Sequence, residues 1–181
     1  MRLPRAASFL GACALAVGAG TGTAPAQTPD GPTDVCSLLT VDEAAKTLGQ
    51  PVGDGTPSTR ELPGTQGSRD SCTWETQQAD TGILSGTRLE LVASLQSNYA
   101  DPDPKACFTA DKRVAQGKHE EKDLKKIGGN EAFYVFTGEV EVLVGPRILN
   151  VHFNNFNTNM FSRMSFERRT VDAAKRAEMR L

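Results

Sequence analysis

The stretch GGNEAFYVFTGEVEVLVGPRILNVHF, residues 128–153, contains the clearest fold signal in this sequence. Its apolar and β-branched residues form three short runs, and a glycine lies in each gap between them. Strand-like runs separated by such short turns are typical of consecutive antiparallel hairpins. The stretch therefore predicts a three-stranded antiparallel meander, with strands at 132–136, 139–144 and 148–153.

A second clear signal is a helix start at Thr40. Thr40 and Glu43 have the spacing of a capping box, in which their side chains accept hydrogen bonds from the first backbone amides of a helix. Gly49 is suited to the left-handed C-terminal cap. A helical apolar stripe lies between these caps and predicts a helix over 41–48; its members are Val41, Ala44, Ala45 and Leu48.

Strand signals also occur between this helix and the meander. Residues 87–95 alternate, with leucine or alanine at every second position from Leu89, which predicts a half-buried strand. Residues 71–75 also have strand character. Residues 50–70 are rich in glycine, proline, threonine and serine. We expect a long surface loop there, with a short edge strand near Pro51-Val52.

The remaining segments are assigned from breakers and charge. Prolines at 102 and 104 precede a predicted helix at 105–116. The densely charged run 118–126 predicts a solvated turn or helix end. Residues 154–159 predict an asparagine-rich bend and residues 160–166 a last strand. Thr170 is predicted to cap a C-terminal helix.

These elements together predict an α+β fold. Their order is helix, two strands, helix, three or four strands, helix. We expect a single antiparallel sheet of about 4–6 strands in residues 35–181, with helices packed mainly on one face. The breaker-rich residues 27–34 predict a flexible spacer before this domain.

Residues 1–26 have the organisation of a secretory signal peptide. A short basic head ends at Arg5, an uncharged small-residue stretch covers 6–20, and Ala24-Pro25-Ala26 matches a cleavage site. The apolar stretch is too short to span a bilayer. The sequence thus predicts cleavage after residue 26 and a periplasmic or secreted protein.

A lipid anchor on Cys13 is the alternative interpretation of the same segment. Leu10-Gly11-Ala12-Cys13 fits the lipobox pattern, which would place the protein at the membrane surface. This interpretation leaves only residues 6–9 as an apolar run, whereas such runs usually have about 7–15 residues. We therefore favour the cleaved form.

Charge and hydropathy exclude several function classes. After cleavage the chain has 18 basic and 22 acidic residues, a net charge of about −4. Nucleic-acid binding depends on concentrated positive charge, so we expect no nucleic-acid partner. No apolar stretch after residue 26 is long enough to span a membrane.

Cleavage also leaves three cysteines, which in an oxidising compartment implies one bridge and one leftover thiol. Three single bridges are possible, and the sequence alone does not choose among them. We favour Cys36–Cys72, because each lies at the edge of a predicted element; Cys107 is then unpaired. No zinc-type spacing such as C-x-x-C occurs, so we expect no metal site.

Four short motifs occur in a familiar order: Val35 to Thr40, Leu48-Gly49, Ser71 to Trp74 and Gly128 to Val135. In these motifs the chain resembles a family of small exported bacterial proteins of unknown function, often lipoproteins, whose domain opens with a C-S-L-L-T-type box. The resemblance covers most of residues 35–181 and implies an α+β envelope domain with Cys36 and Cys72 as the paired cysteines. It brings no catalytic residues, and the chain departs from the family pattern at its lipobox and at Cys107.

No catalytic constellation is recognisable in the chain. A nucleophile elbow and a phosphate loop are both missing from the sequence. A Cys107–His152 dyad is the one nucleophilic pairing worth testing. We therefore expect neither catalysis nor a cofactor.

Aromatic and amide side chains are the better candidates for a binding site. Aromatic residues belong by default to the core, but an uncovered sheet face would turn some of them into a ligand groove. Asparagines after the last meander strand would then supply polar contacts. The candidate contact residues are Trp74, Tyr134, His152, Asn154 and Asn155.

Three functions remain as hypotheses. The first is a non-enzymatic envelope protein that binds a small ligand or an envelope protein partner. The second is a secreted inhibitor or accessory subunit, which uses residues 50–70 or the asparagine-rich bend as its contact surface. The third is an enzyme built on Cys107 and a histidine.

Overall fold

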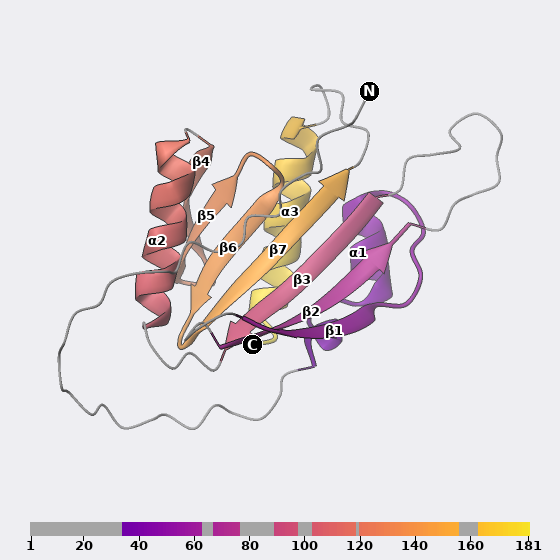
Figure 1. Cartoon of the computed structure of the whole chain (residues 1–181). Coiled ribbons are helices and arrows are strands. Elements are labelled where there is room, and N and C mark those ends of the chain that lie inside the picture. Colours follow the sequence, from indigo (N-terminus) through magenta and orange to yellow (C-terminus); the bar gives the residue numbers. More distant parts are fainter. Residues whose placement is uncertain (1–33, 63–66, 77–88, 98–102, 119, 156–162) are drawn as a thin grey trace, which may run out of the picture.

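A seven-stranded antiparallel sheet is the centre of the described structure (Figure 1). The computed structural model describes residues 34–62, 67–76, 89–97, 103–118, 120–155 and 163–181. In space the strands follow the order β1-β2-β3-β7-β6-β5-β4. Their bounds are β1 Thr56–Glu61, β2 Ser68–Glu75, β3 Leu89–Ser97, β4 Glu121–Ile127, β5 Asn130–Val135, β6 Glu139–Val144 and β7 Arg147–Asn155.

The predicted meander is confirmed and forms the larger half of the sheet. β5, β6 and β7 pair in succession, with Val140 opposite Val151. β4 extends this meander to four strands, and β1 to β3 form a second meander that joins it through the β3–β7 pair. The α+β class is therefore confirmed, but the sheet is larger than the 4–6 strands expected, because segments expected as loop and turn form strands.

The charged run at 118–126 is one of these segments. The expected solvated turn or helix end is wrong, because Glu121–Ile127 forms β4 at one edge of the sheet. An edge strand has one open side, where charged residues are tolerated and discourage pairing with other chains. Ile127 is nonetheless buried and Leu124 is half-buried against the core.

The second segment is the expected surface loop at 50–70. Thr56–Glu61 forms the other edge strand, β1, with all six residues exposed. Exposed polar residues give no period-2 apolar pattern, so the strand has no sequence signal. At the position of the expected edge strand, Val52 makes a single bridge with Thr76.

The C-terminal helix, α3, covers Arg163–Glu178. The strand expected at 160–166 is therefore wrong for its last four residues, and residues 156–162 lie outside the described part. Thr170 lies inside the helix instead of capping it, and its Oγ1 donates to the carbonyl of Phe166 at 2.9 Å. Ring stacking of Phe166 on Phe153, with centroids 4.2 Å apart, favours the helical arrangement over a strand.

One face of the sheet is covered by the 3₁₀ helix η1 (Val35–Leu38), by α1 (Val41–Leu48) and by α3, which lie behind the sheet in Figure 1. The predicted capping box is confirmed: the backbone N–H of Glu43 donates to Thr40 Oγ1 at 3.2 Å, and the Thr40 N–H donates to Glu43 Oε2 at 2.8 Å. Gly49 ends α1 with φ at +76°. We call this side of the sheet the first face.

Small side chains let α3 approach the first face. Ala173, Ala174 and Ala177 are fully buried against it. Beyond the helix, Arg180 donates to both carboxylate oxygens of Glu43, at 2.8 and 2.9 Å, and to the carbonyl of Leu38 at 2.7 Å. The C-terminus is thereby tied to α1 and η1.

The second face of the sheet carries the helix α2 (Pro104–Gly117), on the near side in Figure 1. Phe108 of α2 packs edge-on against Phe133 of β5, with ring centroids 5.2 Å apart. The helices are therefore not confined to one face. Among the residues that the structure describes, the apolar contacts of α2 lie at the β5–β6–β7 end of the sheet: Phe133, Val135, Leu143 and Ile148.

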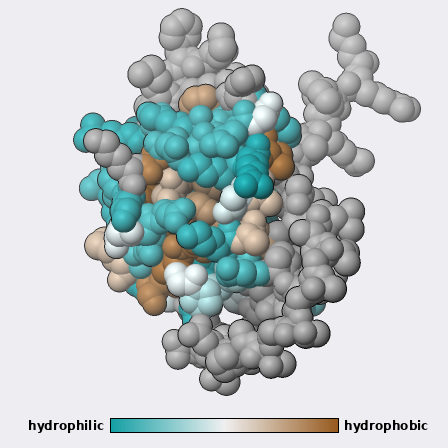
Figure 2. Space-filling model, turned by 90° about the vertical axis from the view of Figure 1, so that its left-hand side faces the viewer, coloured by the Kyte–Doolittle hydropathy of each residue, from teal (hydrophilic) through white to brown (hydrophobic). Residues whose placement is uncertain are grey.

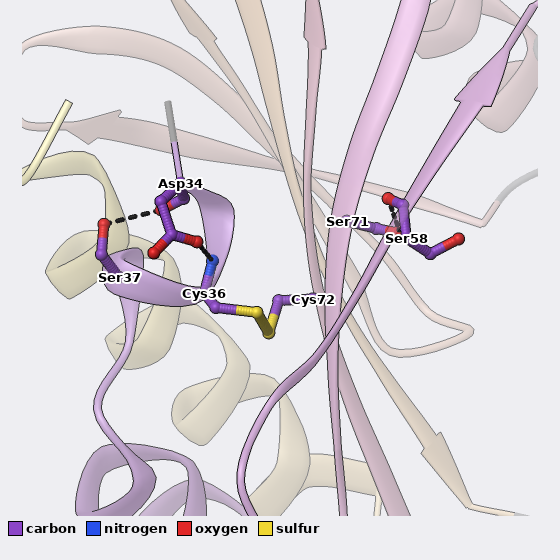
Figure 3. The surroundings of a disulfide bond; sticks show 6 residues. All are labelled: Asp34, Cys36, Ser37, Ser58, Ser71 and Cys72. Atoms are coloured by element: carbon purple, nitrogen blue, oxygen red, sulfur yellow. Dashed lines mark hydrogen bonds between the residues drawn. A yellow bond between two sulfur atoms is a disulfide. The ribbon is translucent and has the colours of Figure 1, made fainter. Parts of the chain in front are cut away.

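A disulfide bond joins η1 to the sheet, as Figure 3 shows. The bond links Cys36 to Cys72, so the favoured pairing is confirmed. The reason given for it was wrong, because Cys36 lies within η1 and Cys72 lies in the interior of β2. The side chain of Ser71 lies on the opposite side of β2 and donates to the carbonyl of Ser58 at 3.2 Å. In the described part of the chain, no helix is long and apolar enough to cross a membrane.

Candidate functional site

Strands β2, β3, β7 and β6 bring a group of polar side chains together on the second face. The register places Arg69 opposite Gln96, Ser94 opposite Asn150, and Asn150 opposite Glu141. Successive residues of a strand point to opposite faces, so these residues share the face on which α2 packs. We call the group the polar strip: Arg69, Ser94, Gln96, Glu139, Glu141, Asn150 and His152.

Hydrogen bonds between neighbouring strands hold the polar strip together. Arg69 Nη2 donates to Gln96 Oε1 at 3.0 Å. Asn150 Nδ2 donates to Glu139 Oε1. Gln96 is only 6% exposed, so the bond to Arg69 is shielded from bulk water on its β3 side. The strip is thus an ordered polar group on interior strands of the sheet, and its members are half-buried or buried.

Glu141 is the most perturbed group of the strip. Burial raises its pKa well above the ordinary value, and the nearby charges of Glu139 and Asp111 raise it further, against a smaller opposing effect of Arg69. The residue as a whole is half-buried, but its Oε2 is shielded from solvent and has no hydrogen-bond partner among the described residues. Arg69 Nε is likewise shielded from solvent and has no hydrogen-bond partner among the described residues.

A second charged group lies where α2 meets β4. Lys112 Nζ forms an ion pair with Asp123, which lowers the pKa of that carboxyl, and lies 3.9 Å from Glu121 Oε1. Burial, followed by the charge of Asp123, raises the pKa of Glu121. Asp123 is 68% exposed, and such exposed pairs contribute little to stability. We assign this group to the attachment of α2 to the edge strand.

The surface around that edge has mixed character. Figure 2 looks onto the side that carries α2 and β4, where hydrophilic residues predominate around separate hydrophobic areas. Phe136, which follows β5, is an exposed large apolar residue at 45%. Single exposed apolar residues are common on protein surfaces, so Phe136 by itself does not indicate a docking surface.

The residues expected to contact a ligand separate into two groups. Trp74 and Tyr134 are 1% and 2% exposed and belong to the first-face core. His152 is half-buried in the polar strip, opposite Glu139. Asn154 pairs with Glu90 on the same face, beyond the strip. Asn155 ends β7, and its side chain lies outside the described part.

Cys107 is buried on α2, where it packs with Phe108 and Phe133. It does not carry a free thiol, because the described residues contain no free cysteine. The structure therefore differs from the expected unpaired thiol, which was an expectation for the chain cleaved after residue 26. A bonded sulfur is not a nucleophile, so the structure offers no support for the Cys107–His152 dyad.

Arg69, Gln96 and Glu141 were missed as candidates from the sequence. One signal was present: Glu139-Val140-Glu141-Val142 places two carboxylates at alternate positions of a strand inside a meander. Charged residues on an interior strand are uncommon and point to a polar or functional face. Within the described residues, no group of three histidine, cysteine, aspartate or glutamate side chains is arranged to hold a metal ion.

Comparisons with known protein families, with curated proteins and with solved structures find no match to this chain. The resemblance to exported proteins with a C-S-L-L-T-type box therefore stays a prediction.

Proposed function

We propose that this chain is an exported, non-enzymatic binding protein whose contact surface is the polar strip. The main support is the distribution of helices. Among the described residues, η1, α1 and α3 cover the first face, whereas α2 makes its apolar contacts at one end of the second. The part of the second face outside these apolar contacts carries the hydrogen-bonding side chains of the polar strip, which suit recognition of a polar partner.

Export is supported by the sequence pattern of residues 1–26 and by the disulfide. An intramolecular bridge is consistent with an oxidising compartment, because cytosolic thiols are normally kept reduced. We propose the periplasm or the exterior of the cell as the location. The partner is a small polar ligand or another envelope protein.

The contact surface is tested by titrating the ¹⁵N-labelled protein with two fractions of an envelope extract, small molecules and macromolecules. Saturable amide shifts that cluster on the polar strip support the proposal. His152→Ala should weaken the response, whereas Thr59→Ala on β1 should leave it unchanged. If both fractions shift only amide signals outside the polar strip, the proposal is wrong.

A second candidate function is supported by β1. All six residues of this edge strand are exposed, and among the described residues only β2 pairs with it. An open edge can pair with an extended segment of another protein. A secreted inhibitor or accessory subunit would bind in this way. The same titration distinguishes it, because the shifts would then lie on β1 and not on the polar strip.

A further inference from the structure

Two complementary orphan atoms lie on the second face of the sheet. Glu141 Oε2 can accept and Arg69 Nε can donate a hydrogen bond, yet neither has a partner among the described residues. Both atoms are shielded from solvent. Polar atoms in such positions are nearly always satisfied, by protein, by ordered water or by a ligand. Their state therefore points to groups that the protein itself does not supply.

The two orphan atoms come from strands at opposite ends of the polar strip. Arg69 is on β2 and Glu141 on β6, with β3 and β7 between them. Strands lie about 4.8 Å apart, so the two backbones are separated by about 14 Å. Long side chains shorten this span, and the charge of Arg69 still lowers the pKa of Glu141. Both residues are half-buried as a whole, so a small molecule can face both groups once their side chains rotate toward it.

The charges around Glu141 favour a positively charged group. Glu139 neighbours it on the same strand, Asp111 acts on it from α2, and Arg69 provides the opposing positive charge. Glu139 is oriented by its bond from Asn150. The described residues lack a metal-binding group of three side chains, which favours an organic cation over a metal ion.

We propose that the polar strip binds a small ligand with a primary ammonium group at one end and a hydrogen-bond acceptor at the other. The ammonium donates to Glu141 Oε2, and the acceptor receives a hydrogen bond from Arg69 Nε. This inference rests on the proposed function, since it names the class of ligand for the same surface.

Binding of this kind is coupled to a proton. Burial and the neighbouring carboxylates raise the pKa of Glu141 and so favour its protonated form, whereas an ammonium pairs best with the carboxylate. Ligand binding should therefore release a proton from Glu141. Affinity should rise with pH until the ligand's own amine loses its charge.

The test is isothermal titration calorimetry of the full chain with putrescine and with glycylglycine, each compared with its N-acetylated form. We expect glycylglycine to bind and N-acetylated glycylglycine, which has no ammonium group, to fail. Putrescine should bind more weakly than N-acetylputrescine, because its far end is a second ammonium group, whereas the acetyl carbonyl of N-acetylputrescine is an acceptor for Arg69. The heat should depend on the ionisation enthalpy of the buffer, which reports proton release. Glu141→Gln should weaken binding at least tenfold, as expected for a hydrogen bond between charged groups.

The matched control is Glu61→Gln on β1, which removes the same charge from an exposed position. It should bind as the wild type does. Thermal unfolding of both variants checks that they are folded. Arg69→Met should weaken glycylglycine, which has an acceptor at its far end, more than putrescine.

Two outcomes would overturn the inference and leave the proposed function standing. In the first, the amines bind but Glu141→Gln binds equally well. In the second, no amine binds, although the envelope extract still shifts the amide signals of the polar strip in the ¹⁵N titration. An ordered water molecule would then be the hydrogen-bond partner of Glu141 Oε2. If the extract also leaves the strip unchanged, the proposed function fails together with the inference.

Discussion

Replacing both Cys36 and Cys72 with alanine should lower the free energy of unfolding by about 4 kcal/mol. The bridge spans a sequence separation of 36 residues. In the chain-entropy model, the lost restraint on an unfolded loop of this length amounts to about 3–4 kcal/mol. Cys72 is also fully buried, and a Cβ at Gly55 would lie only 2.4 Å from its Sγ. Truncation at such a packed position adds up to about 1 kcal/mol.

Urea denaturation followed by the fluorescence of Trp74 measures this loss. Trp74 is the only tryptophan in the chain, is 1% exposed and lies two residues from Cys72. With a slope of about 2 kcal/mol/M, the midpoint should fall by about 2 M. Ser71→Ala is the control, because this neighbour lies on the opposite side of β2, and it should change stability by about 0.5 kcal/mol or less. A loss below about 1 kcal/mol at an unchanged slope would refute the view that the bridge restrains the unfolded chain.

Three further perturbations have expected outcomes. Arg180 lowers the pKa of Glu43 from 4.5 to about 2, so this carboxyl stabilises the fold above its unfolded pKa and the stability is lost as pH falls towards 2. Partial exposure limits the effect to about 1–2 kcal/mol. In acid denaturation, Arg180→Ala should flatten the curve between pH 5 and 2, and an unchanged curve would count against the pair. Gly138→Ala should cost about 1–3 kcal/mol by thermal unfolding, because φ is +101° and the new Cβ would lie 2.8 Å from the carbonyl oxygen of Phe153; Gly117→Ala, with open space around it, is the control that should not destabilise. Phe108→Ala should cost about 3–5 kcal/mol, because it empties the centre of the α2 contact; urea denaturation that shows a loss below about 1 kcal/mol would mean that α2 is not packed on the sheet.

The first helix and the meander were predictable because their signals are local. Thr40, Glu43 and Gly49 each form cap hydrogen bonds or turns within a few residues of their own position, so the caps of α1 can be predicted from local spacing. The short glycine-containing turns at 137–138 and 145–146 likewise join strands that pair with their immediate neighbours. Strand bounds there differ from expectation by at most two residues.

The two edge strands, β1 and β4, were not predicted because most residues of an edge strand need not be buried. β1 is exposed along its whole length, and β4 consists mainly of charged residues. Neither shows the alternation that burial on one face imposes. The predicted C-terminal helix began too late for a related reason. Phe166 has the apolar character of a strand residue, but it lies in α3 and stacks on Phe153 of β7, a contact that the sequence does not show.

The sequence by itself determined the α+β class, the central meander and the favoured Cys36–Cys72 pair. Only the tertiary structure decided where the polar strip lies. Its members come from four strands between residues 69 and 152, and no short motif connects them. They meet because β3 pairs with β7, a contact between two meanders that are separated in the chain by α2. Local spacing determines helices and hairpins, whereas long-range strand pairing determines which side chains face a common partner.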